Sequence, residues 1–376
     1  MIDKNIYLIS WLMLFLFPIN YFEITFGIQV DKAIMVFLSL FLIAYSIFKN
    51  RKIKIMSLVI FLLILYRVFI VKDIFSVNLF ILILCLEIYD QKLNFLNIKI
   101  LKISLLGVIF YSIIYFGQNG RLIHTSIKEI NQSGMILFLL CIGFYVKNEY
   151  KYFIFTSLLL ILTFSRTALL ALVVFLLIDR IKLLRKASLY IKNFYIQLIL
   201  TFFILFGLAN SFEKAFFEKK IVDYQQTFIE RLKSPYDYSN FFRFTINKNL
   251  LEIMYKKKIY LLNGIKEDEL TKENLNLTRI KNIPFRNNKP HNFMFSYLQI
   301  YGILSVFIFI GIGKILNKLT NEKNIGYIIS LLIYTSLLGI GLNSYYLLLI
   351  ISIAQEFNIN KKEIKEKNEK NIKENL

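Results

Sequence analysis

YFIFTSLLLILTFSRTALLALVVFLLI is the sequence of residues 152–178, and Arg166 is the charged residue within it. The run is longer than the ~20 apolar residues that cross a hydrocarbon core of roughly 30 Å. It is therefore either one long helix interrupted by an arginine or two short helices that meet at Arg166. The choice decides how every flanking segment faces the membrane.

Similar apolar runs recur along most of the chain. Hydrophobic residues make up 57% of the 376 residues, whereas a soluble domain has roughly 45–50%. The sequence therefore predicts an all-α polytopic membrane protein with about 12 transmembrane helices. They are expected near residues 6–24, 33–48, 55–71, 74–89, 101–116, 135–146, 152–165, 167–178, 194–210, 293–312, 327–342 and 345–356.

The distribution of Lys and Arg gives the orientation, because short cytoplasmic loops are enriched in both. With the N-terminus inside, basic residues gather in the inner loops, and the outer short loops are poor in them. The basic clusters lie within residues 49–54, 92–102, 147–151, 180–186 and 314–323. This alternation holds over all the spans only if Arg166 lies at an outer turn, which favours two helices. Both termini are then cytoplasmic.

Four regions follow from this topology. Residues 1–210 form the first part of the membrane domain, with helices 1–9, and residues 291–357 form the second, with helices 10–12. Between them, residues 211–290 form a large outer loop, expected to be helical at 212–232 and 241–260 and turn-like at 266–278. Residues 358–376 are a cytoplasmic tail, charged, without apolar residues that could anchor it, and expected to be disordered.

The net charge of +21 lies largely in the short loops, where it sets topology, so nucleic acid is not an expected partner. Cys85 and Cys141 fall inside apolar runs and are expected to be packing residues, without a disulfide or metal cluster. The sequence has no glycine-rich phosphate loop and no cytoplasmic loop large enough for a nucleotide domain. No cofactor is expected.

Arg166 is the first candidate for chemistry. An arginine within an apolar run is costly unless it is paired or hydrated, so it is a functional candidate by default. Its guanidinium can bind a phosphate through two parallel hydrogen bonds. The alternative is an arginine that snorkels to the outer surface. Arg67, near the outer end of the expected third helix, poses the same choice, and there we favour snorkelling.

Two further candidates lie in and at the end of the large loop. Arg243 stands in Phe-Phe-Arg-Phe-Thr-Ile, whose apolar residues predict a helix packed on the membrane domain. His291 stands in Lys-Pro-His-Asn-Phe-Met, and a histidine can accept a proton near neutral pH, which suits a general base. The alternative for His291 is an interfacial hydrogen-bonding role. The other histidine, His124, is assigned no chemical role, because two histidines alone are poor evidence for a metal site.

Three segments together resemble motifs of the O-antigen ligase and O-antigen polymerase superfamily. Residues 162–172, with Ser-Arg-Thr at 165–167, resemble its helix–Ser-Arg–helix motif. Arg243 followed by Asn263-Gly264 resembles its Arg…Pro-x-x-Gly-x-Gly segment. Pro-His-Asn at 290–292, followed by Gly-Ile-Leu at 302–304, resembles its His-Asn…Gly-Ile-x-Gly segment. The chain departs from the family in having one glycine, Gly264, in place of Gly-x-Gly, and in lacking a tryptophan near Arg243.

The resemblance implies a GT-C-like fold and a metal-independent, inverting glycosyltransferase of the bacterial inner membrane, with the large loop in the periplasm. The donor would be a glycan on undecaprenyl diphosphate and the acceptor lipid A–core or another glycan, among membrane lipids. Arg166 and Arg243 would neutralise the departing diphosphate, and His291 would deprotonate the acceptor hydroxyl. Three further residues are expected to bind substrate, namely Arg121, Asn131 and Asn292.

Two alternatives remain open. A polymerase of O-antigen or capsule repeats would share the fold and the site, and the ligase is only slightly favoured by the Ser-Arg and Pro-His-Asn segments. A polysaccharide transporter or flippase would predict charges near the membrane midplane and broken helices in matched halves. The candidate charges instead gather near the outer surface in the expected topology.

Overall fold

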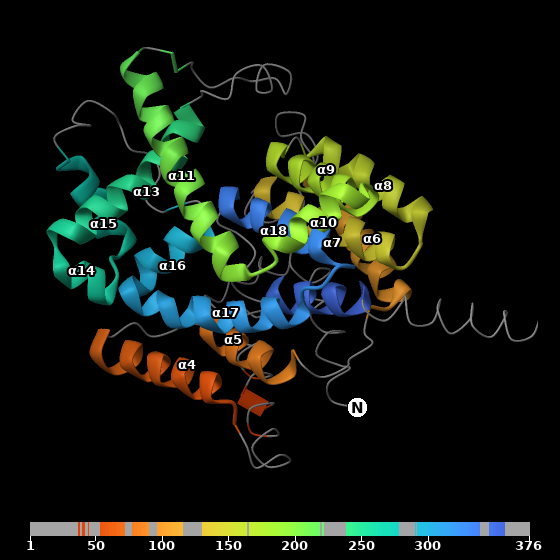
Figure 1. Cartoon of the computed structure of the whole chain (residues 1–376), viewed down its shortest axis with the longest axis horizontal. Coiled ribbons are helices and arrows are strands. Elements are labelled where there is room, and N and C mark those ends of the chain that lie inside the picture. The colour runs from red at the N-terminus through yellow and green to blue at the C-terminus, as the bar shows by residue number, and fades with distance from the viewer. Residues whose placement is uncertain are drawn as a thin grey trace, which may run out of the picture. The chain divides into compact units, whose positions relative to one another are not determined.

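The computed structural model describes residues 37, 40, 41, 44, 53–71, 77–89, 96–115, 130–163, 165–218, 220–221, 238–277, 290, 292–338 and 346–357. The regular elements within these residues are helices, and no strand occurs among them (Figure 1). The all-α part of the expected fold is therefore confirmed for the described part of the chain.

The chain divides into two compact units. The first comprises Met1–Lys192, Gly311–Leu332 and Gly341–Leu376, and the second comprises Asn193–Ile310 and Ile333–Ile340. The second unit thus contains the predicted large loop together with apolar helices on either side of it. Each unit is described below by itself.

The first unit contains two pairs of helices in extensive contact, α4 with α5 and α7 with α8. The π-helical turn η2 continues α4 without interruption. The elements are α4 (Ile55–Tyr66), η2 (Arg67–Val71), α5 (Val77–Ile88), α6 (Ile98–Tyr115), α7 (Ile130–Val146), α8 (Tyr150–Leu162), α9 (Arg166–Arg180), α10 (Lys182–Tyr190) and the unlabelled helix Tyr346–Phe357. Cys85 and Cys141 are buried in α5 and α7, as expected of packing residues.

The second unit is organised around α13, which contacts α11, α14, α15 and α16. Its helices are α11 (Phe194–Phe217), α13 (Tyr238–Lys256), α14 (Lys258–Asn263), α15 (Glu267–Leu275), α16 (Phe293–Tyr301) and η4 (Gly302–Leu304). Two helices straddle the unit boundary, α17 (Ser305–Leu319) and α18 (Ile325–Leu338). The central position of α13 is notable because this helix carries Arg243.

The structure breaks the apolar run of residues 152–178 into two helices, as the charge alternation predicts. Helix α8 ends at Leu162 and α9 begins at Arg166. The expected helix 241–260 is also interrupted, because Lys257 adopts an extended conformation between α13 and α14. The expected turn-like segment 266–278 is corrected: most of it forms α15, whose first turn carries Glu267, Asp268 and Glu269. Acidic groups there interact favourably with the positive end of the helix dipole.

Two helices of the described chain are long and apolar enough to cross a membrane. They are Phe194–Phe217 and the continuous helical segment Phe293–Leu319, formed by α16, η4 and α17. Six shorter apolar helices, of 10–17 residues, accompany them. Helix α11 begins at Phe194, after the N-cap Asn193, whose side-chain oxygen accepts a hydrogen bond from the Tyr195 backbone N–H at 2.9 Å.

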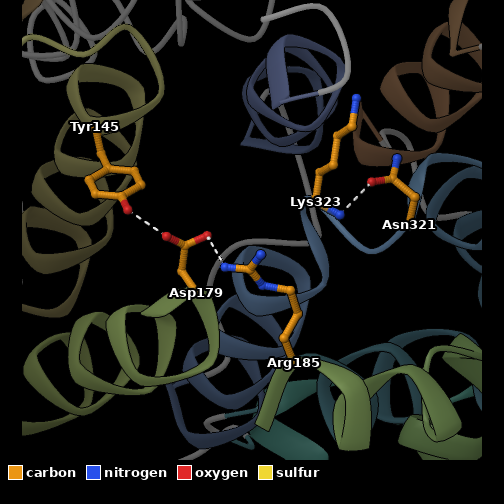
Figure 2. Close-up of polar contacts among 5 residues, drawn as sticks. All are labelled: Tyr145, Asp179, Arg185, Asn321 and Lys323. Carbon is orange, nitrogen blue, oxygen red and sulfur yellow. Dashed lines mark hydrogen bonds and ion pairs between the residues drawn. The ribbon is translucent and has the colours of Figure 1, made fainter. Parts of the chain in front are cut away.

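Polar contacts in the first unit join helix ends that the charge pattern assigns to one side of the membrane. Figure 2 shows the Tyr145 hydroxyl directed at Asp179, which connects the ends of α7 and α9. The Lys147 ammonium lies 2.6 Å from the Glu356 carboxylate, which is almost fully buried. Contacts of the same kind are Lys54–Glu87, Gln355–Tyr89 and Asn324–Ala354. Ends expected at the cytoplasmic face are therefore neighbours within this unit.

Candidate functional site

The residues expected to perform the chemistry fall in different parts of the chain. Arg166 belongs to the first unit and Arg243 to the second, so each is described in its own surroundings. His291 and Arg121 lie outside the described residues. Asn131 is the second residue of α7.

Arg166 occupies the first position of α9, directly after the turn from α8. The N-cap is Ser165, whose hydroxyl accepts a hydrogen bond from the Ala168 backbone N–H at 3.4 Å. The Ser165 N–H in turn donates to the Thr163 hydroxyl at 3.2 Å. The turn is thus held by short side chains, and the half-buried guanidinium stands at the positive end of the helix dipole. A cation and a helix N-terminus at one place both favour a bound anion.

Arg67 differs from the expected snorkelling side chain. It is 5% exposed and lies where the helix passes from α4 into the π-helical turn η2. π-helical turns inside helices occur frequently at functional sites. A guanidinium enclosed by protein is therefore a second candidate for anion recognition in the first unit. The position of Arg67 within an apolar run was the available signal for a functional role in the sequence. We favoured snorkelling as the explanation of that position.

Arg243 is held on α13 by a cluster of phenylalanine rings, as its apolar neighbours suggest. The Phe241 ring stacks on Phe216 of α11 with centroids 4.9 Å apart, and Phe244 stacks on Phe212 at 5.1 Å. An ion pair between Lys248 and Glu213 fastens the same two helices one turn further on. The backbone that carries Arg243 is therefore fixed relative to α11, which suits a group that must be positioned.

Asn247 stands one helical turn after Arg243, on the same face of α13. Its side chain is 2% exposed, and within the described part of the chain its Oδ1 atom accepts no hydrogen bond. Thr245 on α13 and Asn274 on α15 are also buried with unsatisfied side-chain atoms among the described residues. Buried polar groups are normally hydrogen-bonded, so each of these requires a partner such as water or a ligand. Sequence reasoning overlooked Asn247, although a polar residue one turn from an arginine in an apolar helix was the available signal.

Two glycines join α14 to the end of α16 by direct backbone contact. A Cβ atom on Gly264 would lie 2.2 Å from the carbonyl oxygen of Ile300, and one on Gly302 would lie 2.4 Å from that of Leu261. Both glycines have positive φ, at 81° and 56°. The Ile265 N–H completes the contact by donating to the Gln299 carbonyl at 2.7 Å. We call this contact the glycine clasp.

The glycine clasp fixes the helix that follows His291. Helix α16 begins after Asn292, whose Oδ1 accepts a hydrogen bond from the Phe295 N–H at 2.8 Å. Ser296 donates its hydroxyl to the Pro290 carbonyl at 3.0 Å. Residues on both sides of position 291 are thus bound to α16. Asn292 has a structural role as an N-cap, and substrate binding by its remaining amide stays a prediction.

A second contact holds the start of α14, at its N-cap Lys257. The hydrogen bond from the Lys257 ammonium to the Glu273 carboxylate raises the pKa of Lys257 and connects the start of α14 with α15. Among the described residues, no group of three His, Cys, Asp or Glu side chains is placed to hold a metal ion.

Comparison of the chain with protein-family models, with curated proteins and with solved structures gives no match.

Proposed function

We propose that this protein is a multi-pass inner-membrane glycosyltransferase of the O-antigen ligase type. It transfers a glycan from undecaprenyl diphosphate to lipid A–core at the periplasmic face, without a metal or nucleotide. The proposal includes about twelve spans and cytoplasmic termini. The contacts among helix ends in the first unit support that topology, because ends expected on one side lie together.

The glycine clasp is the observation that carries the proposal. The resemblance to the ligase and polymerase superfamily rests in part on Gly264 after Arg243 and on Gly302 after His291. A conformation available essentially to glycine alone accounts for both residues at once. Their contact ties α14, which follows the Arg243 helix, to α16, which follows His291. This contact supports the interpretation of the two segments as parts of one site.

The surroundings of each arginine, taken separately within its own unit, support the chemistry of a lipid diphosphate donor. Arg166 stands at a helix N-terminus and Arg243 on a rigid helix, and guanidinium groups bind phosphate oxygens bidentately. In the transfer, the acceptor hydroxyl oxygen attacks the anomeric carbon while the bond from that carbon to the diphosphate oxygen breaks. His291 takes the hydroxyl proton, and undecaprenyl diphosphate leaves with the bonding electron pair. An in-line displacement inverts the anomeric carbon.

Exposed apolar surface supports the membrane location. Helix α11 exposes Ile196, Ile199, Leu200, Phe203 and Ile204, and α8 exposes Ile154, Phe155 and Leu158. Contiguous apolar patches of this kind are rare on soluble monomers and mark contact with another apolar phase. Hydrocarbon chains of lipid are the phase that helices of this composition require.

Glycolipid analysis of a deletion strain tests the proposed function. Polymer that accumulates on undecaprenyl diphosphate, with lipid A–core left bare, is the expected result for a ligase. Single repeats on lipid A–core would indicate the polymerase instead, and an unchanged glycolipid profile would contradict both. The matched control is complementation with Lys256→Ala, which alters an exposed cation of α13 and should restore the profile, in parallel with Arg243→Ala, which should not.

A further inference from the structure

Helix α10 is a short basic helix between two apolar ones. It covers Lys182–Tyr190, immediately after α9 and four residues before the start of α11. Five basic residues lie within residues 180–192, namely Arg180, Lys182, Arg185, Lys186 and Lys192. The sequence suggested only a cytoplasmic loop there, so the helix is a finding of the structure.

The outward surface of α10 combines apolar and basic groups. Leu183 is 76% exposed and Tyr190 is 87% exposed. The two residues are two helical turns apart and therefore share a face. Lys182 and Lys186 are exposed and lie together along one edge of that face, whereas Ser188 is buried on the far side of the helix. A leucine and a tyrosine beside two lysines form an amphipathic surface without a partner among the described residues.

The inward surface of α10 is anchored by one carboxylate. Arg185 lies 3.5 Å from Asp179, which also accepts the hydrogen bond from the Tyr145 hydroxyl (Figure 2). The sequence 179–193 contains a single acidic residue, Asp179. Its charge is therefore directed at Arg185 and Tyr145, and the exposed lysines are left without an acidic neighbour in this segment. The contact between Arg185 and Asp179 therefore fixes the orientation of α10, and Lys182 and Lys186 keep its outer face positively charged.

The geometry points to α10 as a helix that lies on the bilayer surface and binds anionic phospholipid headgroups. Leu183 and Tyr190 would enter the headgroup and acyl boundary, as apolar residues of interfacial helices do. Lys182 and Lys186 would extend to the phosphates beside them. This occupant fits better than an acidic soluble protein, because both flanking helices are apolar and begin or end within a few residues of α10. The inference rests on the proposed membrane location and is independent of glycan transfer.

A fluorescent probe at residue 183 of the full-length protein tests this inference. The Leu183→Cys variant is labelled with an environment-sensitive fluorophore. Cys85 and Cys141 are both buried, so the wild-type protein treated in the same way should take up little label. The protein is reconstituted into vesicles of phosphatidylcholine and phosphatidylglycerol, and vesicle flotation verifies incorporation. A nitroxide near the headgroup is carried either by phosphatidylcholine or by phosphatidylglycerol at equal mole fraction. The matched control is the same probe at Lys272→Cys, an exposed position of α15.

We expect quenching at position 183 but not at position 272, and stronger quenching by the phosphatidylglycerol nitroxide. Each lysine near an anionic surface contributes about 1 kcal/mol, or about fivefold in local lipid enrichment. Lys182→Gln combined with Lys186→Gln should therefore abolish most of the preference, whereas Lys266→Gln combined with Lys272→Gln, read with the probe at 183, should preserve it. High salt should also reduce the preference, because it screens exposed charges.

Three outcomes would overturn the inference. Quenching at position 183 no stronger than at position 272 would mean that α10 faces water, which would leave an acidic protein partner as the occupant. Equal quenching by the two nitroxides would refute anionic selectivity. Failure of the protein to float with the vesicles would remove the membrane location itself, and the proposed function with it.

Discussion

Gly264 and Gly302 each lack the Cβ atom that would collide with backbone carbonyl groups next to the other glycine. Gly264 lies against the carbonyl oxygens of Gln299 and Ile300, and Gly302 lies against those of Leu261 and Leu262. The contact is reciprocal, so neither glycine can gain a side chain without displacing backbone. Through it, the loop segment after Arg243 and the helix after His291 become one structural element.

We predict that Gly264→Ala and Gly302→Ala each lower the thermal stability of the purified protein. The backbone has φ/ψ of 81°/178° at Gly264 and 56°/−144° at Gly302. Such a conformation costs a residue with a side chain about 1–3 kcal/mol, before the overlap with carbonyl oxygens is counted. Thermal unfolding in detergent is the measurement. The control is Gly207→Ala in α11, where a Cβ atom meets nothing within 4 Å and alanine should be neutral or stabilising. Equal melting temperatures for all three variants would refute the glycine clasp.

Asn292 allows structural and substrate roles to be separated. Asn292→Ala removes the N-cap of α16 and should cost about 0.5–2 kcal/mol of stability. Asn292→Ser keeps an acceptor for the Phe295 N–H, so its stability should approach that of the wild type. Transfer by Asn292→Ser then reports on the amide alone. Full activity in that variant would assign Asn292 to capping and remove it from the substrate site.

Asn247 should respond in opposite directions in two assays. Its buried Oδ1 has no hydrogen bond among the described residues, and an unsatisfied buried polar group costs about 1–3 kcal/mol. Asn247→Leu should therefore leave the stability of the substrate-free protein unchanged or raised, while glycan transfer falls. Thermal unfolding and transfer are measured on the same preparation, with Asn249→Leu as a second buried amide of α13. A destabilised Asn247→Leu protein would indicate a structural partner in place of a ligand.

His291→Ala should lose turnover while retaining the donor. General-base catalysis typically contributes about 10²–10⁴-fold, and the variant keeps both arginines that are proposed to bind the diphosphate. Turnover and binding of undecaprenyl diphosphate-linked glycan are measured side by side, with His124→Ala as the control expected to keep most activity. Near-normal turnover in His291→Ala would remove the base from the mechanism.

The sequence predicted the elements that depend on hydrophobic runs and on charge alternation. The break at Arg166 followed from the alternation of basic loops, and the structure has separate helices on either side of it. The apolar helix from Phe194 was expected to end at Asn210, and a separate helix was expected over 212–232. Both expectations are corrected: one helix runs from Phe194 to Phe217, residues 218, 220 and 221 are not helical, and residues 222–232 lie outside the described part of the chain. This part of the helix contains charged residues: Glu213 pairs with Lys248, and Lys214 is exposed. Neither ends the helix, and a hydropathy pattern does not reveal that the helix continues through them.

Features that depend on tertiary contact were not predictable in the same way. Helix α15 is short and polar, and short helices are marginal unless they pack on a neighbour. Leu270 and Asn274 bury its inner face, and α15 contacts α13. The glycine clasp likewise joins segments distant in sequence, so positive φ at Gly264 and Gly302 leaves no local pattern. The burial of Arg67 follows from packing around η2, which its apolar run alone could not specify.

Turnover of purified protein with a lipid-linked donor, measured in EDTA, tests the central claim most directly. The account predicts glycan transfer to the acceptor without nucleotide or divalent ion. Arg166→Ala and Arg243→Ala should lose transfer and donor binding while folded protein remains. Arg166→Lys should also be poor, because lysine cannot form the bidentate contact. Transfer that stops in EDTA and returns with a divalent ion, or full activity in either alanine variant, would contradict diphosphate stabilisation by the two arginines.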